Sequence, residues 1–169
     1  MRTRLYVVTG LFMVSFMFVT FPAFTSDRII NVQYSQLTPA AKKQVDCLAE
    51  NIYFEAGHEP EEGKKAVALV TLNRVQDPRY PKDICSVVKQ RVNSTCQFSW
   101  HCEAGKYVRN RKAYDDAKQM ALFVYANYEN LKDITKGALY YHADYVNPRW
   151  QLQKTVIIGR HIFYKEKGI

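Results

Sequence analysis

The sequence predicts an α+β fold that is mainly α-helical, with a small β element near the C-terminus. Two consecutive apolar segments between residues 38 and 76, and a third over about 112–131, repeat their apolar residues every three or four positions. This spacing is typical of amphipathic helices, whereas the β-branched run TVIIGRHIFYK near the end favours strands. With 169 residues, 47% of them hydrophobic, the chain can form one domain with a core.

The first predicted helix begins after Thr38, a good N-cap, with Pro39 at its first position. Gly57 is expected to end it. One face carries a stripe of apolar residues: Ala41, Val45, Leu48 and Ile52. This stripe predicts which side of the helix faces the core.

The second helix is expected to start around Pro60, and its apolar residues cover most of its surface, which predicts a central position. ICSVVKQ reads as a short helix or turn. Residues 93–110 read as a long loop closed by a disulfide, and the aromatic-rich ALYYHADYVNPRWQ as irregular. TVIIGRHIFYK is expected to form a strand or a tight hairpin around Gly159.

The N-terminus has the layout of an export signal. MRTR is followed by an uncharged apolar run from Leu5 to Phe24. We expect residues 1–26 to be a signal peptide or an N-terminal membrane anchor, 27–37 a linker, and 38–169 the functional domain. The domain would then lie in the periplasm or outside the cell, in contact with the membrane if the segment is not cleaved.

Four cysteines fit an exported domain, because disulfides persist in oxidising compartments. Three pairings are possible. Cys96 and Cys102 can close a local loop, which leaves Cys47 with Cys85. A metal site built from Cys96, His101 and Cys102 is the alternative, but its spacing matches no common zinc pattern, so we expect no metal.

The net charge of +8 favours an anionic partner. Export disfavours nucleic acid as that partner. The seven glycines are not clustered into a phosphate-binding loop, and we expect no cofactor.

Glu55 continues the apolar stripe, three residues after Ile52. A carboxyl group among apolar neighbours is paired, protonated or functional, and burial raises its pKa, which suits a general acid. The alternative is that Glu55 pairs with a Lys or Arg or marks where the stripe meets water. Glu59 can simply cap the helix that follows it.

Four motifs in order resemble the SleB-type cell wall hydrolase family, across about residues 45–165. They are CLAENIYFEAGHEPEEGKKAVALVTLNRVQDPRYPKDICSVV, CQFSWHCEAG, YYHADYVNPRW and IGRHIFY. The family pattern usually reads Glu-Ala-Arg-Gly-Glu. This sequence has Gly57 and His58 between Glu55-Ala56 and Glu59, so both glutamates keep their register.

The resemblance implies a peptidoglycan-cleaving domain with a lysozyme-like or transglycosylase-like fold, in which Glu55 is the acid and base. It favours a lytic transglycosylase that breaks the bond between N-acetylmuramic acid and N-acetylglucosamine with one carboxyl group. True hydrolysis needs a second carboxyl, for which Asp144 and Glu59 are the candidates. A zinc amidase acting on the peptide stems and a non-catalytic wall-binding module are the alternative functions.

Sugar sites combine aromatic faces with short polar groups. Two segments therefore become candidate walls of the substrate site, although each aromatic could equally be core. The expected substrate-binding residues are Glu59, Gln97, Phe98, Ser99, Trp100, Tyr141, His142, Tyr145 and Asn147. His161 lies in the strand-like segment and is expected to be structural.

Overall fold

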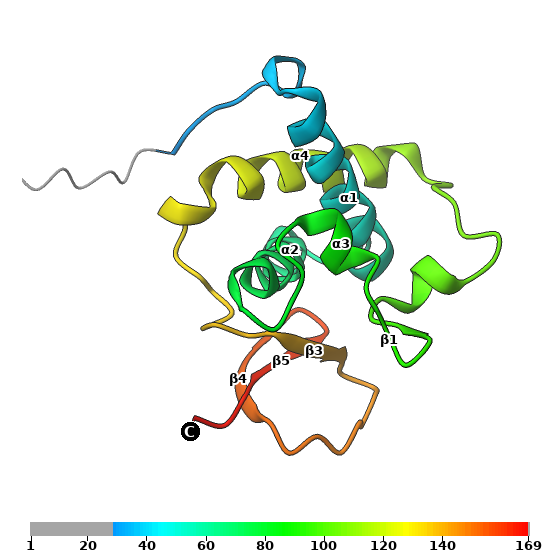
Figure 1. Ribbon diagram of the computed structural model, residues 1–169, viewed down its shortest axis with the longest axis vertical. Helices are drawn as coiled ribbons and strands as arrows, with labels where there is room; N and C mark the ends of the chain where they lie inside the picture. Colours follow the sequence, from blue (N-terminus) through cyan, green and yellow to red (C-terminus); the bar gives the residue numbers. More distant parts are fainter. Residues whose placement is uncertain (1–28, 169) are drawn as a thin grey trace, which may run out of the picture.

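The computed structural model describes residues 29–168, which form four packed α-helices and a small C-terminal sheet beside them (Figure 1). This confirms the predicted α+β, mainly helical class. The elements are η1 (Tyr34–Gln36), α1 (Pro39–Ala56), α2 (Glu61–Gln76), α3 (Ile84–Val88), β1 (Arg91–Val92), β2 (Thr95–Cys96), η2 (Ser99–Cys102), α4 (Arg111–Asn127), η3 (Tyr128–Asn130), β3 (Tyr140–Ala143), β4 (Gln153–Ile158) and β5 (His161–Lys165).

Helix α1 begins where the sequence predicts. The Thr38 hydroxyl accepts a hydrogen bond from the Ala41 backbone N–H at 3.2 Å, which satisfies one free donor of the first turn. Val45, Leu48 and Ile52 are fully buried in the main core. The predicted stripe therefore does face the interior.

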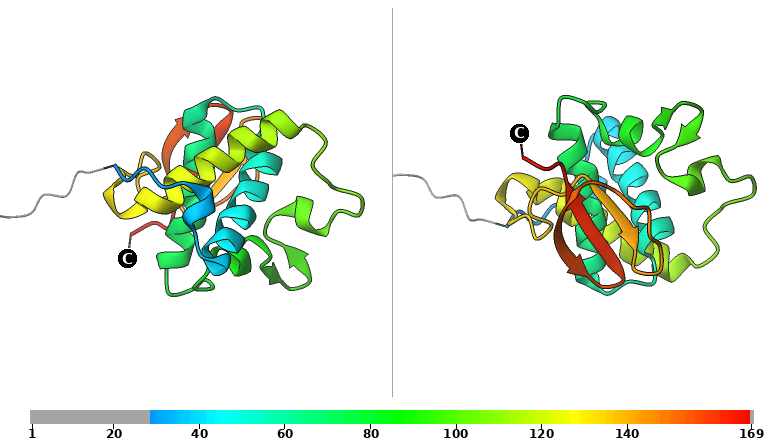
Figure 2. Two further views of the ribbon diagram at one scale, coloured as in Figure 1. Left: turned by 90° about the horizontal axis from the view of Figure 1, so that it is seen from above. Right: turned by 90° about the horizontal axis from the view of Figure 1, so that it is seen from below.

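Helix α2 lies between two layers, as its apolar surface predicts. Residues 66–72 are all buried. Leu69 belongs to the core shared with α1, α3 and α4, whereas Val70 packs in a second cluster with Phe163 of β5. Figure 2 shows the sheet crossing α2 on the side away from α1 and α4.

The sheet has the strand order β3-β5-β4, and both pairs are antiparallel. The predicted hairpin is present: β4 and β5 flank Gly159, whose φ of +56° suits a residue without a Cβ. β3 lies in the segment expected to be irregular, so that expectation was wrong. Its partner β5 lies about twenty residues further on, and no local pattern reveals such a pairing.

The segment 93–110 is also more regular than expected. It contributes β2 of the β1–β2 hairpin and the 3-10 helix η2 before it becomes extended. Both favoured disulfides are present. Cys47–Cys85 joins α1 to α3, and Cys96–Cys102 ties β2 to the end of η2.

An asparagine at the end of α4 holds the chain that leads into the domain. The Asn127 side chain accepts from the Ile30 N–H and donates to the Ile30 carbonyl at 3.0 Å. We call this pair of bonds the Asn127 clamp. It imitates a backbone pairing with a side-chain amide, and it fixes the direction in which the chain enters.

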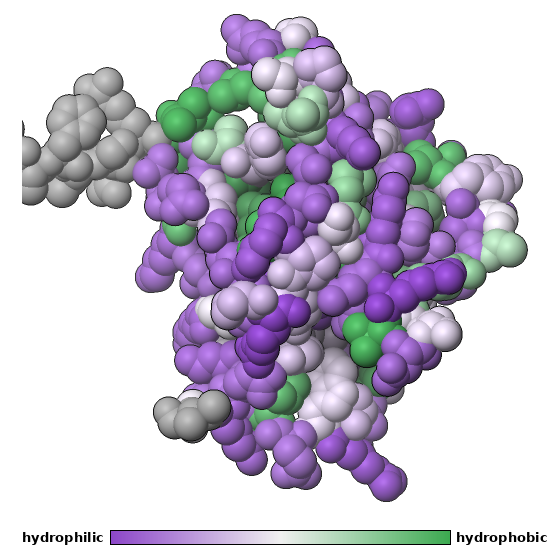
Figure 3. Space-filling model, viewed as in Figure 1, coloured by the Kyte–Doolittle hydropathy of each residue, from purple (hydrophilic) through white to green (hydrophobic). Residues whose placement is uncertain are grey.

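The visible surface is mostly hydrophilic, with small separate apolar patches (Figure 3). Over residues 29–168 no helix is both long and apolar enough to cross a bilayer. The predicted signal or anchor at 1–26 lies outside the described residues.

Candidate active site

Glu55 lies in the last turn of α1, where the helix meets the sheet. Its side chain is half-buried, and its Oε2 accepts a hydrogen bond from the Tyr141 hydroxyl of β3 at 3.2 Å. The apolar stripe carries the carboxyl group inward, and the strand supplies its partner. Among the described residues, Oε1 has no hydrogen-bond partner and remains available to a ligand.

The environment of Glu55 favours its protonated form. Burial raises the pKa of Glu55, while the hydrogen bond from Tyr141 and the positive charge of Arg74 act in the opposite direction. Burial also raises the pKa of Tyr141 well above its usual range, so its hydroxyl stays a donor. A raised pKa suits a general acid, because the carboxyl group holds its proton to a higher pH than a free glutamate does.

A pocket of about 190 Å³ opens in front of Glu55. It is bounded by the end of α1, the residues after it, and the β3 and β5 ends of the sheet. Its lining residues are Phe54, Glu55, Ala56, Gly57, His58, Glu59, Ala143, Tyr145, Arg160 and His161.

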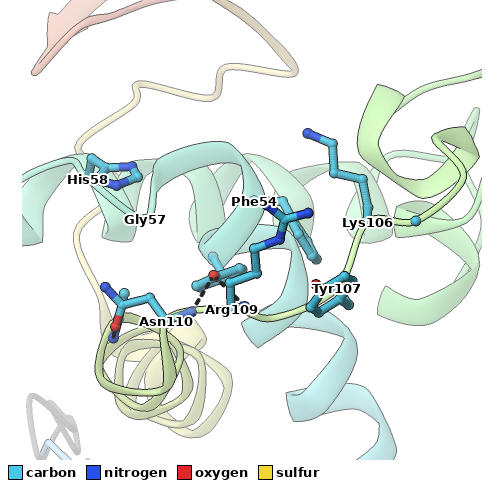
Figure 4. Close-up of a pocket in the computed structure, with 10 residues that line it drawn as sticks. Phe54, Gly57, His58, Lys106, Tyr107, Arg109 and Asn110 are labelled. Carbon is cyan, nitrogen blue, oxygen red and sulfur yellow. Dashed lines mark hydrogen bonds between the residues drawn. The ribbon is translucent and has the colours of Figure 1, made fainter.

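A second recess of about 330 Å³ adjoins this pocket and shares Phe54, Gly57 and His58 with it (Figure 4). The two hollows therefore share one wall at the end of α1, and Glu55 lines the smaller of them.

Glu59 lines the smaller pocket with Glu55, but its carboxylate already accepts a hydrogen bond within the protein. Oε2 accepts the backbone N–H of Arg160 at 2.9 Å, in the turn between β4 and β5. A Cβ at Gly159 would collide with that same oxygen. Glu59 thus joins the segment after α1 to the hairpin turn, and its predicted contact with substrate stays a prediction.

Asp144, the other candidate second carboxylate, pairs with Arg160 at 3.3 Å and is not among the pocket residues. Both partners are largely exposed to solvent. Tyr145 lines the pocket, and its ring lies 5.7 Å from the Arg160 guanidinium; its contact with substrate stays a prediction.

The first predicted wall, residues 97–100, does not line the Glu55 pocket. Phe98 and Trp100 are buried in the core, and Trp100 stacks on Phe54 with ring centroids 4.5 Å apart while donating to Asn51 at 3.2 Å. Gln97 is exposed beside a different hollow, and Ser99 is exposed and donates to Glu103. The segment turns from β2 into η2 here, and Phe98 and Trp100 face the core while Gln97 and Ser99 face solvent.

The second predicted wall also divides between two faces. Tyr141 points toward Glu55, so its neighbour His142 points to the opposite face of β3. There His142 stacks on Tyr164 and its Nε2 lies 3.0 Å from that hydroxyl. Asn147 is exposed in the loop after β3 and is not among the pocket residues.

Two residues near Glu55 were missed or given another role. Arg74 is buried in α2, donates from Nε to the Leu139 carbonyl at 2.8 Å, and packs its guanidinium on Phe98. His161, expected to be structural, lines the pocket with its ring edge against Tyr141, and burial lowers its pKa. A charged residue inside the apolar α2 was the available signal for Arg74, of the same kind that drew attention to Glu55.

No cluster of three or more His, Cys, Asp or Glu side chains within residues 29–168 has the arrangement of a metal site.

A half-buried carboxyl group that lines an open pocket, in a mainly helical domain, is an arrangement that permits acid–base chemistry. The model of the cell wall hydrolase family matches residues 58–164, and the chain belongs to this family. The matched range begins three residues after Glu55, so the role of that residue rests on the geometry and on the motif.

Solved structures and curated relatives agree with this family. The chain resembles the catalytic domain of the germination-specific lytic transglycosylase SleB from Bacillus anthracis, with 28% identity, a TM-score of 0.58, and coverage of 73% of this chain and 95% of that one. The catalytic domain of the Bacillus cereus SleB protein follows with 26% identity, a TM-score of 0.54, and coverage of 73% and 91%. The fold is therefore that of SleB catalytic domains.

Among curated proteins, the chain is similar to two spore cortex-lytic enzymes. The one from Halalkalibacterium halodurans is 28% identical over 138 residues, and the one from Bacillus subtilis 29% identical over 126 residues. These matches cover 79% and 73% of this chain but 38% of each relative, so the chain spans well under half the length of these enzymes.

Proposed function

We propose that this chain degrades peptidoglycan by cleaving the glycan strand between N-acetylmuramic acid and N-acetylglucosamine, as a lytic transglycosylase. The observation that carries the proposal is the position of Glu55: half-buried, hydrogen-bonded to Tyr141 through one oxygen, and open to the pocket through the other. A wall substrate also fits the expected export of the domain and its net charge of +8.

In the proposed mechanism Glu55 acts twice. Its protonated carboxyl first gives a proton to the glycosidic oxygen as the bond to the muramic acid C1 breaks. The resulting carboxylate then takes a proton from the 6-hydroxyl of the same sugar while that oxygen bonds to C1. The product is a 1,6-anhydro sugar, and Glu55 regains its proton. Tyr141 keeps the carboxyl group oriented and stabilises its charged form between the steps.

The state of the other carboxylates supports a mechanism with one acidic group. A hydrolase needs a second carboxyl to act as nucleophile or to activate water. Glu59 is bonded to the hairpin turn, and Asp144 is paired with Arg160. The 6-hydroxyl of the substrate replaces the second group, so neither residue has to leave its partner.

Mass spectrometry of digested, purified peptidoglycan tests the proposal. We expect muropeptides lighter by one water than the products of hydrolysis, and the same products in the presence of a strong chelator. Ordinary reducing ends would instead require a water nucleophile and a second carboxylate. Release of intact peptide stems, lost with chelator and restored by zinc, would identify an amidase.

A further inference from the structure

The larger recess beside Glu55 is basic. We call it the basic recess; its lining residues are Tyr53, Phe54, Gly57, His58, Gly105, Lys106, Tyr107, Arg109, Asn110 and Ala113. Lys106 and Arg109 supply its fixed positive charges, and no lining residue is a carboxylate. Figure 4 shows both long side chains reaching from the same segment, across the recess from His58 and Phe54.

The segment that carries these cations is fixed to the helix of Glu55. The Tyr53 hydroxyl accepts hydrogen bonds from two successive backbone groups, the N–H of Arg109 and the N–H of Asn110, each at 3.1 Å. Tyr53 precedes Glu55 by two residues on α1. The recess therefore keeps a defined position relative to the carboxyl group.

The two cations are available to a ligand. Lys106 pairs with Glu103 at 3.0 Å, but both side chains are about half exposed, so solvent weakens the pair. Arg109 lies with its guanidinium 4.9 Å from the Tyr107 ring, which orients its donors. Among the described residues, no carboxylate pairs with Arg109.

We propose that the basic recess binds the carboxylates of the peptide stem attached to the muramic acid, and so makes the enzyme prefer stem-bearing glycan. This inference rests on the proposed function. The stem branches from the sugar whose bond is cleaved, so it lies beside the Glu55 pocket when that sugar is bound there. The basic recess adjoins that pocket, and a volume of about 330 Å³ can hold a short peptide segment.

The test compares three forms of one purified glycan: strands with complete stems, strands with the stem carboxyls converted to amides, and strands with the stems removed. The variants are Lys106→Ala/Arg109→Ala and the charge-keeping Lys106→Arg/Arg109→Lys. Lys89→Ala is the matched control, because it removes an exposed cation that lines neither hollow. Glu55→Gln provides the inactive reference. We measure kcat and KM for each combination of enzyme variant and glycan.

We expect wild-type kcat/KM to be about tenfold or more higher on the stem-bearing strands than on the other two forms, since charge-assisted hydrogen bonds are strong. The double alanine variant should lose this preference through a higher KM on the stem-bearing strands. The charge-keeping variant should retain most of the preference, and Lys89→Ala all of it.

Equal cleavage of the three glycans by wild type would overturn this inference and leave the proposed function intact. The inference would also be overturned if the double alanine variant cleaved all three glycans more slowly by the same factor. A third outcome would also overturn it: wild type shows no stem preference, and a poly(glycerol phosphate) chain inhibits wild type but not the double alanine variant. The recess would then bind phosphate polymers instead. If wild type cleaves none of the glycans, the proposed function itself fails, and this inference fails with it.

Discussion

At Glu55, burial and hydrogen bonding act on the pKa in opposite directions, and burial is the larger effect. The folded protein therefore binds the Glu55 proton more tightly than the unfolded chain, in which a glutamate titrates near pH 4.3. Between that pH and the raised pKa, stability falls as the pH rises, because the native state holds more protons. The charged form of Glu55 is thus less favourable in the folded protein than in the unfolded chain.

Replacing Glu55 with Gln should separate catalysis from stability. The amide keeps the shape but has no proton to transfer, so turnover on purified peptidoglycan should fall by roughly 10²–10⁴-fold. The melting temperature at neutral pH should match or exceed that of wild type, and this difference should shrink below about pH 4.

Glu50→Gln, on the same helix and outside the Glu55 pocket, is the control and should change neither quantity. If Glu55→Gln instead lost stability, on the order of 3–5 kcal/mol, and kept its turnover, Glu55 would be one partner of a buried pair.

Tyr141→Phe tests the partner of the acid. The Tyr141 hydrogen bond lowers the pKa of Glu55, so its loss should raise that pKa further. The alkaline limb of the kcat/KM profile should move up by about one pH unit, since such a bond to a charged group contributes about 1.5 kcal/mol. An unchanged profile would mean that Tyr141 does not act on the titrating group.

Glu55 could be predicted from the sequence because the helical spacing of the apolar residues places this charged residue on the buried face. It could not separate the substrate-facing aromatics from core residues, because the composition around Trp100 suits both. The strand that divides Tyr141 from His142 was not recognised, so both were assigned to one wall. The positive charge of Arg74 acts on Glu55 only because tertiary packing brings α2 near the end of α1.

At the scale of elements, the β4–β5 turn and the segment after α1 are fixed to each other by Glu59. Gly159 serves this contact twice: its φ is positive, and its missing Cβ leaves room for the Glu59 carboxylate. The turn also precedes His161, which lines the Glu55 pocket. A change at Gly159 should therefore affect both stability and activity.

Gly159→Ala should destabilise the protein by more than the roughly 1–2 kcal/mol that a positive φ costs, because of the collision with Glu59. Gly137→Ala is the control: its φ is +77° and nothing lies near the added carbon. Chemical denaturation gives the two values, and activity should fall for Gly159→Ala alone. Equal losses of stability for Gly159→Ala and Gly137→Ala would show that the Glu59 side chain moves aside at no cost in free energy.

The two disulfides should differ in their contributions. They span 38 and 6 residues, and the loop-entropy relation gives about 4 and about 2 kcal/mol at 25 °C. Cys47→Ser/Cys85→Ser should therefore lower the unfolding free energy more than Cys96→Ser/Cys102→Ser. If the Cys96/Cys102 variant lost more stability, the short loop would stabilise the folded protein by holding Trp100 in place, and this effect would exceed the difference in chain entropy.

Local patterns predicted the elements that depend on neighbours in sequence: α1 with its cap and stripe, the central α2, and the hairpin around Gly159. They missed β3, because antiparallel pairing with a distant strand leaves little trace in four residues. The basic recess was also not predictable, because it forms when the segment 105–110 folds back onto Tyr53.

For the whole molecule, the charge of +8 should act mainly on association with the wall. Binding of the Glu55→Gln protein to purified, anionic peptidoglycan should weaken steadily as salt rises toward 1 M, where the screening length falls to about 3 Å. Sedimentation with the wall measures this. The melting temperature in the same buffers is the control and should change little. Binding that is indifferent to salt would point to aromatic stacking instead.

The Asn127 clamp has a mechanical consequence. The clamp grips Ile30 at one end of α4, while Asn110 and Ala113 border the basic recess at the other. The seventeen residues of that helix span about 25 Å. A force applied to the chain at Ile30 would therefore act on the Asn127 end of α4, one helix length away from the residues that border the basic recess. The recess would keep its shape under such a load, because the helix between the two ends is stiff.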